Sequence, residues 1–324
     1  MATARDWKTA RHADGPHPVR QADVAALNQV FSDAFTERYR RDGMVGVRVP
    51  FLNPAIWRYA IEDAGNGAMV WRGERDEIVA FNIAHRSGIE GWMGPLAVRP
   101  EWQGGGLGKE IVRAGVRWLS ERSARVIGLE TMPRTMDNIG FYSGLGFLPT
   151  RLTVTLTLDA AAGDASALLY GRLSSRDKED MLAECLTLTQ ALVPGYDYSR
   201  EITLTDALSL GDTLVVRNAG RVIAFALCHT APLVEGRTRE ELRVLKMIVA
   251  DPAEFEACCR ALMDYARRSG TRRVAFRVQG EYVEAYARLV AMGARVRWTD
   301  LRMCMAGYPE PKAERGIVLS NWEI

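Results

Sequence analysis

The sequence predicts an α/β protein built from two similar halves, and three observations carry that prediction. Segments with the alternating pattern of strands are interspersed with amphipathic helical segments along the chain. Blocks of the first half recur in the second half in the same order. A glycine-rich loop at residues 104–108 joins a strand-like segment to a long helical one. With 324 residues, the chain has room for two domains of typical size.

In the first half, the patterns predict a strand, two helices, three strands, the glycine loop, a helix, a strand, a helix and a last strand. The helix after the loop has the clearest period, since Leu107, Ile111 and Trp118 fall on one face. The expected elements are a short strand at 19–20, helices 22–41 and 57–63, strands 68–72, 77–85 and 89–98, a helix from 107, strand 125–130, helix 138–145 and strand 152–158.

The second half repeats this plan, which indicates a tandem duplication. Four pairs of blocks match in order at offsets of 144 to 152 residues: 78–85 with 222–229, 96–100 with 248–252, 125–127 with 273–275, and 145–147 with 292–294. We therefore expect a flexible arm at residues 1–16, a first domain at 17–158, a linker rich in Ala, Gly and Asp at 159–166, and a second domain at 167–324.

The composition indicates a soluble cytoplasmic protein without a membrane or nucleic-acid partner. Charged residues make up 25% and hydrophobic residues 48% of the chain, and the net charge of +2 gives no basic surface for nucleic acid. No apolar run reaches the length of a transmembrane helix, and the N-terminus has no signal-peptide core. Five cysteines without a Cys-x-x-Cys motif are expected to be reduced, and the four histidines lack metal-ligand spacing. No metal is expected.

The glycine loop predicts an anion site. Four of its five residues are glycine, so the backbone can approach a ligand closely, and the start of the following helix offers unpaired amides. A pyrophosphate suits such a site. The loop is not a P-loop, because Gln103 stands where that motif needs glycine and Glu110 where it needs a hydroxyl. The glycine spacing of dinucleotide-binding loops is also absent.

One other pattern fits the loop. Gln103, Gly106 and Gly108 satisfy Gln/Arg-x-x-Gly-x-Gly/Ala, and residues 96–100 read Leu-Ala-Val-Arg-Pro. Together these resemble the acyl-CoA-binding segment of the GCN5-related N-acetyltransferases (GNAT). The resemblance implies two tandem GNAT-like domains, each a mixed, mostly antiparallel sheet flanked by helices, and acetyl-CoA as co-substrate. It assigns cofactor binding to Leu96, Ala97, Val98, Gln103, Gly104, Gly105, Gly106, Leu107, Gly108, Lys109 and Asn138.

The segment 138–147 supplies a candidate catalytic residue. Tyr142, Gly146 and Phe147 resemble the Tyr-x-x-x-Gly-Phe segment of the same family. The resemblance implies that the Tyr142 hydroxyl acts as general acid toward the CoA sulfur. The sequence departs from the family seven residues before the tyrosine, where Thr135 replaces the usual Asn.

The general base is less clearly marked. An alkylamine has a pKa of about 10, so a base is needed to release its proton at neutral pH. Family members often carry a Glu on the strand before the glycine loop, and Glu90 lies two residues before the matching position at Trp92. His85 is a second candidate, although its counterpart His229 in the second half favours a structural role for both.

The predicted function is an N-acetyltransferase that moves an acetyl group directly from acetyl-CoA to a primary amine of a small molecule or peptide. The alternative is a non-catalytic acyl-CoA sensor or scaffold, and a homodimer is compatible with either. The second half is a degenerate copy, since residues 253–259 lack glycine and Leu289 stands at the position of Tyr142. One CoA per chain is therefore expected. The final segment, residues 316–324, has the pattern of an ordered strand.

Overall fold

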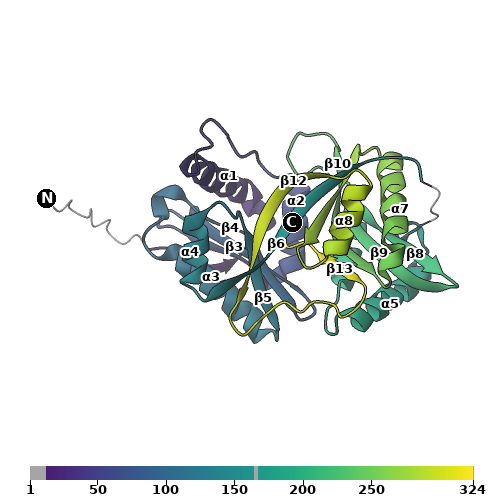
Figure 1. Cartoon of the computed structure of the whole chain (residues 1–324). Coiled ribbons are helices and arrows are strands. Elements are labelled where there is room, and N and C mark those ends of the chain that lie inside the picture. Colours follow the sequence, from purple (N-terminus) through teal and green to yellow (C-terminus); the bar gives the residue numbers. More distant parts are fainter. Residues whose placement is uncertain (1–11, 164–166, 324) are drawn as a thin grey trace.

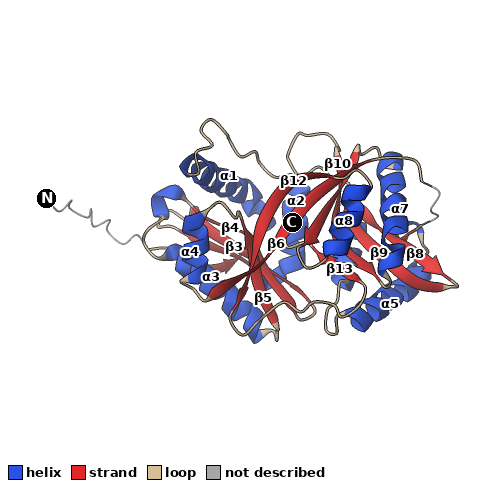
Figure 2. Ribbon diagram, in the orientation of Figure 1, coloured by secondary structure: helices blue, strands red, loops and turns tan. Residues whose placement is uncertain are grey.

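The computed structural model describes residues 12–163 and 167–323, and its strands form one continuous mixed sheet. The strand order is β1-β2-β3-β4-β5-β12-β6-β11-β10-β9-β8-β7, with β13 paired to β10. Helices cover both faces of this sheet, and the two halves of the chain lie at its two ends (Figures 1 and 2).

The two halves have the same order of elements. The first half comprises β1 (Asp14–Pro18), α1 (Val24–Arg41), α2 (Pro54–Ala64), β2 (Ala68–Arg72), β3 (Ile78–Ser87), β4 (Glu90–Val98), α3 (Leu107–Glu121), β5 (Val126–Thr131), α4 (Met136–Ser143) and β6 (Phe147–Asp159). The second half comprises β7 (Leu168–Leu169), α5 (Ser175–Leu192), α6 (Ser199–Ala207), β8 (Gly211–Asn218), β9 (Arg221–His229), β10 (Glu241–Val249), α7 (Phe255–Arg268), β11 (Arg273–Gln279), α8 (Val283–Ala291) and β12 (Arg295–Met305), followed by β13 (Ile317–Ser320).

These elements follow the predicted order, with differences at a few boundaries. The first strand lies at Asp14–Pro18 rather than at residues 19–20, so it includes the end of the expected arm, whose residues 1–11 lie outside the described part of the chain. Strand β6 begins at Phe147, five residues earlier than expected. Of the expected linker, Asp159 still belongs to β6, and residues 164–166 are not described.

The two halves exchange their last strands. Strand β6 of the first half pairs with β11 of the second half, and β12 of the second half pairs with β5 of the first. The exchanged strands also pair with each other along most of their length, at the centre of the sheet (Figure 1). Each half is thus completed by a strand from the other, and β12 brings second-half side chains to the edge of β5.

The helices of the first half are placed by close packing on the sheet. Helix α3 packs on β3, where Gly115 leaves no room for a side chain beside Asn82 and Met93. Helices α1 and α2 pack on β4 and β3, and their buried side chains belong to a hydrophobic core that continues into the second half. A second core lies under α3 and α4. The rigid start of α3 therefore stands at a fixed place relative to β4.

Candidate active site

The site lies where two parallel strands separate. Strand β4 pairs with β5 only from Glu90 to Met93, and the two strands then diverge. A cleft of about 690 Å³ opens between the end of β4, the end of β5, the glycine loop, α4 and α1. Its far end is closed by residues of the second half, among them Trp298 and Asp300 of β12 and Trp322 and Glu323 after β13.

The glycine loop borders one end of this cleft. Gly104 and Gly106 adopt positive φ angles of 88° and 94°, which side-chain-bearing residues rarely take. Gly106 is the N-cap of α3, and a Cβ atom added there would meet no atom within 4 Å. In the described part of the chain, the amides of residues 104–108 donate to no backbone carbonyl. Several N–H groups at a helix start are thus available to an anion.

Two polar side chains complete this end. Gln103 Nε2 donates to the carbonyl oxygen of Val98 at 2.9 Å and so ties the loop to the end of β4. Lys109 lines the cleft, and no ion pair or hydrogen bond of its side chain occurs within the described residues. Its charge is available to a phosphate.

Most of the predicted cofactor-binding residues meet at this cleft. It is lined by Leu96, Ala97, Val98, Gln103, Gly104, Gly106, Gly108, Lys109 and Asn138. Two predicted residues are not on its wall. Gly105 points into open space, and the Leu107 side chain is buried in the core under α3. The Asn138 side-chain amide donates to Thr131 Oγ1 at 3.4 Å. The Thr135 hydroxyl donates to Asp42 Oδ2 at 2.9 Å.

Tyr142 lies on the wall of the cleft. Tyr142 belongs to α4 and is buried, with 8% of its surface exposed. The ring packs edge-on against Phe141 and Phe147, which fixes its direction. Burial raises the pKa of the Tyr142 phenol well above its usual value of 10, so the hydroxyl keeps its proton at neutral pH. A protonated hydroxyl in a cleft can donate to a leaving group.

Glu90, the predicted base, is fully buried and is not among the residues that line the cleft. Its Oε1 accepts a hydrogen bond from Trp322 Nε1 at 2.8 Å, and its Oε2 lies 3.6 Å from Lys246 Nζ. The Trp322 ring separates this buried pair from the cleft, because Trp322 itself lines the wall. Glu90 thus joins β4 to the second half in the interior.

Aromatic residues of the first two helices divide between cleft and core. Phe31, Phe35 and Tyr39 of α1 line the cleft, whereas Trp57 of α2 is buried in the core. His85 is buried. Its Nδ1 lies 2.6 Å from Asp63 Oδ2, and its ring stacks on the Trp92 ring. Its counterpart His229 is buried against Thr205 at 3.0 Å. Neither histidine lines the cleft, in keeping with structural roles for both.

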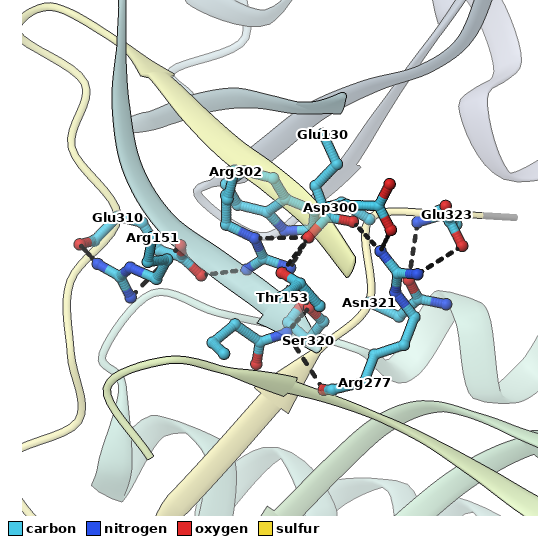
Figure 3. A network of polar contacts seen from close by, with 12 residues as sticks. Glu130, Arg151, Thr153, Arg277, Asp300, Arg302, Glu310, Ser320, Asn321 and Glu323 are labelled. Carbon is cyan, nitrogen blue, oxygen red and sulfur yellow. Dashed lines mark hydrogen bonds and ion pairs between the residues drawn. The ribbon is translucent and has the colours of Figure 1, made fainter. Parts of the chain in front are cut away.

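The cleft floor contains a charged network that sequence reasoning missed (Figure 3). Arg277 of β11 contacts three carboxylates: Glu130 of β5 at 2.5 Å, Asp300 of β12 at 3.0 Å and Glu323 at 2.8 Å. Arg302 adds a second contact to Glu130 at 2.9 Å. Of these residues, Glu130, Asp300 and Glu323 line the cleft.

The same network gives two of its acids opposite properties. Burial raises the pKa of Glu130, but the charges of Arg277 and Arg302 outweigh it and hold the pKa at about 2. For Asp300, burial and the neighbouring Glu323 and Glu130 carboxylates outweigh Arg277 and raise the pKa to about 7. Glu130 is therefore a permanent anion, whereas Asp300 can take up and release a proton near neutral pH.

No local signal in the sequence marks Asp300. It stands in a strand of the degenerate half, 158 residues after Tyr142, and only the strand exchange brings it to this cleft. Trp298, two residues earlier on the same strand, donates from Nε1 to Asp300 Oδ1 at 3.1 Å. The indole and Arg277 together fix both carboxylate oxygens.

In the second half, as far as residues 167–323 describe it, the space between β10 and β11 that corresponds to this cleft is filled. The strands β10 and β11 pair from Glu241 to Arg243 and then separate, as β4 and β5 do. There β13 fills the gap, pairing antiparallel with residues 246–249 of β10. Ile248 and Val249, the counterparts of Leu96 and Ala97, are the residues that β13 covers. Of the strand expected at residues 316–324, the part from Ile317 to Ser320 is an ordered strand, and it occupies the place where the first half is open.

Within the described residues, no group of three or more His, Cys, Asp or Glu side chains is arranged to hold a metal ion. None of the described helices combines the length and the apolar character needed to cross a lipid bilayer.

Comparison with known proteins agrees with this geometry. Residues 26–147, which contain the glycine loop and Tyr142, match the sequence profile of the Acetyltransferase (GNAT) family. No curated protein matches the sequence.

Solved structures extend the likeness to the whole chain. A protein of Pyrococcus horikoshii assigned to the acetyltransferases superposes with a TM-score of 0.67 at 13% identity, covering 99% of this chain and 98% of its own. A tandem GNAT protein of clavulanic acid biosynthesis has a TM-score of 0.57 at 11% identity, with coverage of 91% and 98%. N-myristoyltransferase of Saccharomyces cerevisiae with bound myristoyl-CoA has a TM-score of 0.61 at 11% identity, with coverage of 96% and 86%.

At identities of 11–13%, the solved structures show that the fold is shared and no more. The sequence profile matches the first half to the GNAT family. The second half repeats the element order of the first but lacks its glycine loop. Residues 26–147 are thus identified as a GNAT domain, and the chain as a whole has the fold of tandem GNAT proteins.

Proposed function

We propose that the protein is an N-acetyltransferase that transfers the acetyl group of acetyl-CoA directly to a primary amine. The observation that carries the proposal is the single cleft shared by an anion-binding glycine loop, a protonated tyrosine and a carboxylate with a pKa of about 7. A reaction that removes a proton from an amine and gives one to a thiolate needs these two groups together.

In this proposal, the free amides of residues 104–108 and Lys109 hold the pyrophosphate. The pantetheine arm lies along the unpaired edge of β4 at Leu96, Ala97 and Val98, in the position that β13 takes in the second half. The thioester then points toward the widened space between β4 and β5, beside Tyr142. This placement makes the reaction effectively intramolecular.

We assign the general base to Asp300 instead of Glu90. Asp300 lines the cleft, and the ionised fraction of a carboxylate with a pKa of about 7 is substantial at neutral pH. The ammonium of the acceptor gives its proton to Asp300, and its nitrogen attacks the thioester carbonyl. The new C–N bond forms as the C–S bond breaks, and the Tyr142 hydroxyl protonates the departing thiolate. The second proton on the nitrogen is then lost and restores the Tyr142 hydroxyl, while Asp300 releases its proton to solvent. The products are an acetamide and free CoA.

The alternative is a sensor that binds acyl-CoA without turnover. It would require the glycine loop but neither Tyr142 nor a base with a raised pKa, so the presence of both groups in the cleft favours the enzyme.

A turnover assay separates the two functions. The full-length protein is incubated with acetyl-CoA and a panel of primary amines, free thiol is followed, and products are examined by mass spectrometry. The enzyme yields thiol and an acetylated amine in equal amounts. Tight binding of CoA with no acetylated product from any amine would support the sensor.

A further inference from the structure

We propose that the acceptor is a hydrophobic primary amine with no carboxylate beside the amino group, and that the second half supplies its ammonium-binding site. This inference rests on the proposed function. It concerns the end of the cleft remote from the glycine loop, where α1 faces β12 and the segment after β13.

The charges at this end suit a cation. Three carboxylates, those of Glu130, Asp300 and Glu323, share the single guanidinium of Arg277. Glu130 is also paired with Arg302, so Arg277 is the guanidinium that Asp300 and Glu323 share in ion pairs, and Arg243 is a further cation that acts on Glu323. The Glu323 side chain is 50% exposed, so it can reach a ligand that enters the cleft. An ammonium ion bound between these two carboxylates compensates the excess negative charge.

The cations on the cleft wall near this end have acidic partners, and Arg134, whose guanidinium lies 5.9 Å from the Trp298 ring centroid, is not among the residues that line the cleft. Among the described residues, the basic side chains that line the cleft are Arg38, Arg41 and Lys109. Arg38 binds Asp42 and, at 3.2 Å, Asp137. Arg41 binds Glu37 at 2.9 Å. Lys109 is on the glycine-loop side.

An acceptor carboxylate would therefore meet acids without a free counter-ion. Juxtaposed like charges at a binding site are strongly unfavourable. The electrostatic pattern thus excludes free α-amino acids, in which a carboxylate lies two bonds from the nitrogen.

The walls around the carboxylates are apolar. Phe31, Phe35 and Leu52 line the side formed by α1 and the segment after it, and Leu233 and Trp298 come from the second half. Aromatic rings beside an ammonium site also attract the cation itself. An acceptor with an apolar body and one ammonium group complements both features.

Three compounds of similar shape test this assignment. 2-Phenylethylamine has no carboxylate, L-phenylalaninamide has a neutral amide in its place, and L-phenylalanine has the charged group. We expect acetylation of the first two, with kcat/KM for phenylalanine lower by about 100-fold or more. Phenylalanine acetylated as well as phenylethylamine would overturn the inference while leaving the enzyme function intact. Absence of acetylation with any amine would instead overturn the proposed function.

A variant tests the role of the second half. Glu323→Gln keeps the shape of the side chain and removes its charge. We expect the KM for phenylethylamine to rise about tenfold, with kcat within about threefold and CoA affinity unchanged. Glu314→Gln serves as the control, since Glu314 is exposed in the same C-terminal region and does not line the cleft. An unchanged KM in Glu323→Gln would show that this carboxylate does not bind the amine.

Discussion

At the scale of single residues, one guanidinium sets up two carboxylates for different roles. Arg277 contacts both Glu130 and Asp300, yet only Glu130 has a second arginine, Arg302. The extra cation keeps the pKa of Glu130 at about 2, while the pKa of Asp300 rises to about 7. Because Glu130 has two arginine partners, it stays ionised and stabilises the fold. Asp300 has one arginine partner and can exchange a proton near neutral pH.

Tyr142→Phe removes the proposed acid and little volume. We expect kcat to fall at least about tenfold, because a general acid typically contributes about 10²–10⁴-fold. The affinity for CoA, measured by calorimetry, should stay close to that of the wild type. Unaltered turnover across the pH range would mean that Tyr142 only packs against Phe141 and Phe147.

Glu130→Gln leaves Arg277 and Arg302 without a shared anion. We expect the free energy of unfolding at pH 7 to fall by about 3 kcal/mol, the usual scale for breaking a buried ion pair. Because the folded pKa of Glu130 is depressed from 4.5 to about 2, its contribution is complete above pH 4.5 and is lost as the pH falls toward 2.

Urea unfolding of wild type and Glu130→Gln at pH 7 and pH 3 measures this window. The difference between the two proteins should shrink at pH 3. The exposed Glu121→Gln is the control, and it should match the wild type at both pH values. A difference for Glu130→Gln that is as large at pH 3 as at pH 7 would contradict the assigned pKa.

At the scale of elements, the glycine loop and strand β13 occupy equivalent clefts in the two halves. The loop leaves backbone amides free beside an open β4 edge, whereas β13 covers the matching edge of β10. Lacking both the glycines and the open edge, the second half cannot take a pantetheine arm without losing β13.

This difference predicts one CoA per chain. Titration calorimetry of the full-length protein should give a stoichiometry of one. Gly106→Val should abolish binding, because φ of 94° is unfavourable for a β-branched residue and the side chain would enter the open space beside the loop. A stoichiometry of two, or unchanged affinity in a folded Gly106→Val protein, would refute the placement.

Local patterns were sufficient for the element order and for most of the cofactor end of the cleft. Periodicity locates α3, and the spacing of Gln103, Gly106 and Gly108 locates the anion site because both properties depend on neighbouring residues. The strand exchange was not predictable. The alternation in β6 is the same whether its partner is β5 or β11, since register and partner are set by contacts distant in sequence.

The contribution of the second half to the other end of the cleft was not predictable for the same reason. Asp300 and Glu323 look like ordinary charged residues of a degenerate half, and Glu90 looks like the family's base. Only the three-dimensional arrangement buries Glu90 behind Trp322 and brings Asp300 to the cleft.

At the scale of the whole molecule, the second half is part of the candidate active site. It contributes β12 to the edge of β5, and it supplies Trp298, Asp300, Trp322 and Glu323 to the cleft. A fragment of residues 1–160 would expose the edge of β5 and lack all four side chains. We expect this fragment to be insoluble or inactive although it contains the glycine loop and Tyr142.

Expression of residues 1–160 alone and together with 161–324 tests this dependence. Activity should appear only when both fragments are present. A soluble first fragment with the full activity of the intact chain would contradict the composite site.

The most direct test of the composite site is the pH dependence of kcat/KM for acetyl-CoA and 2-phenylethylamine in the wild type, Asp300→Asn and Glu90→Gln. The raised pKa of Asp300 predicts wild-type activity that increases through about pH 7, as the carboxylate loses its proton. Asp300→Asn should lose at least about 100-fold in kcat together with this limb. Glu90→Gln should keep the limb and lose stability, because Lys246 loses a buried anionic partner, whereas the glutamine Oε1 still accepts from Trp322 Nε1. The result that would contradict this assignment is a rise of kcat/KM through pH 7 that persists in Asp300→Asn and disappears in Glu90→Gln. The general base would then be Glu90 of β4.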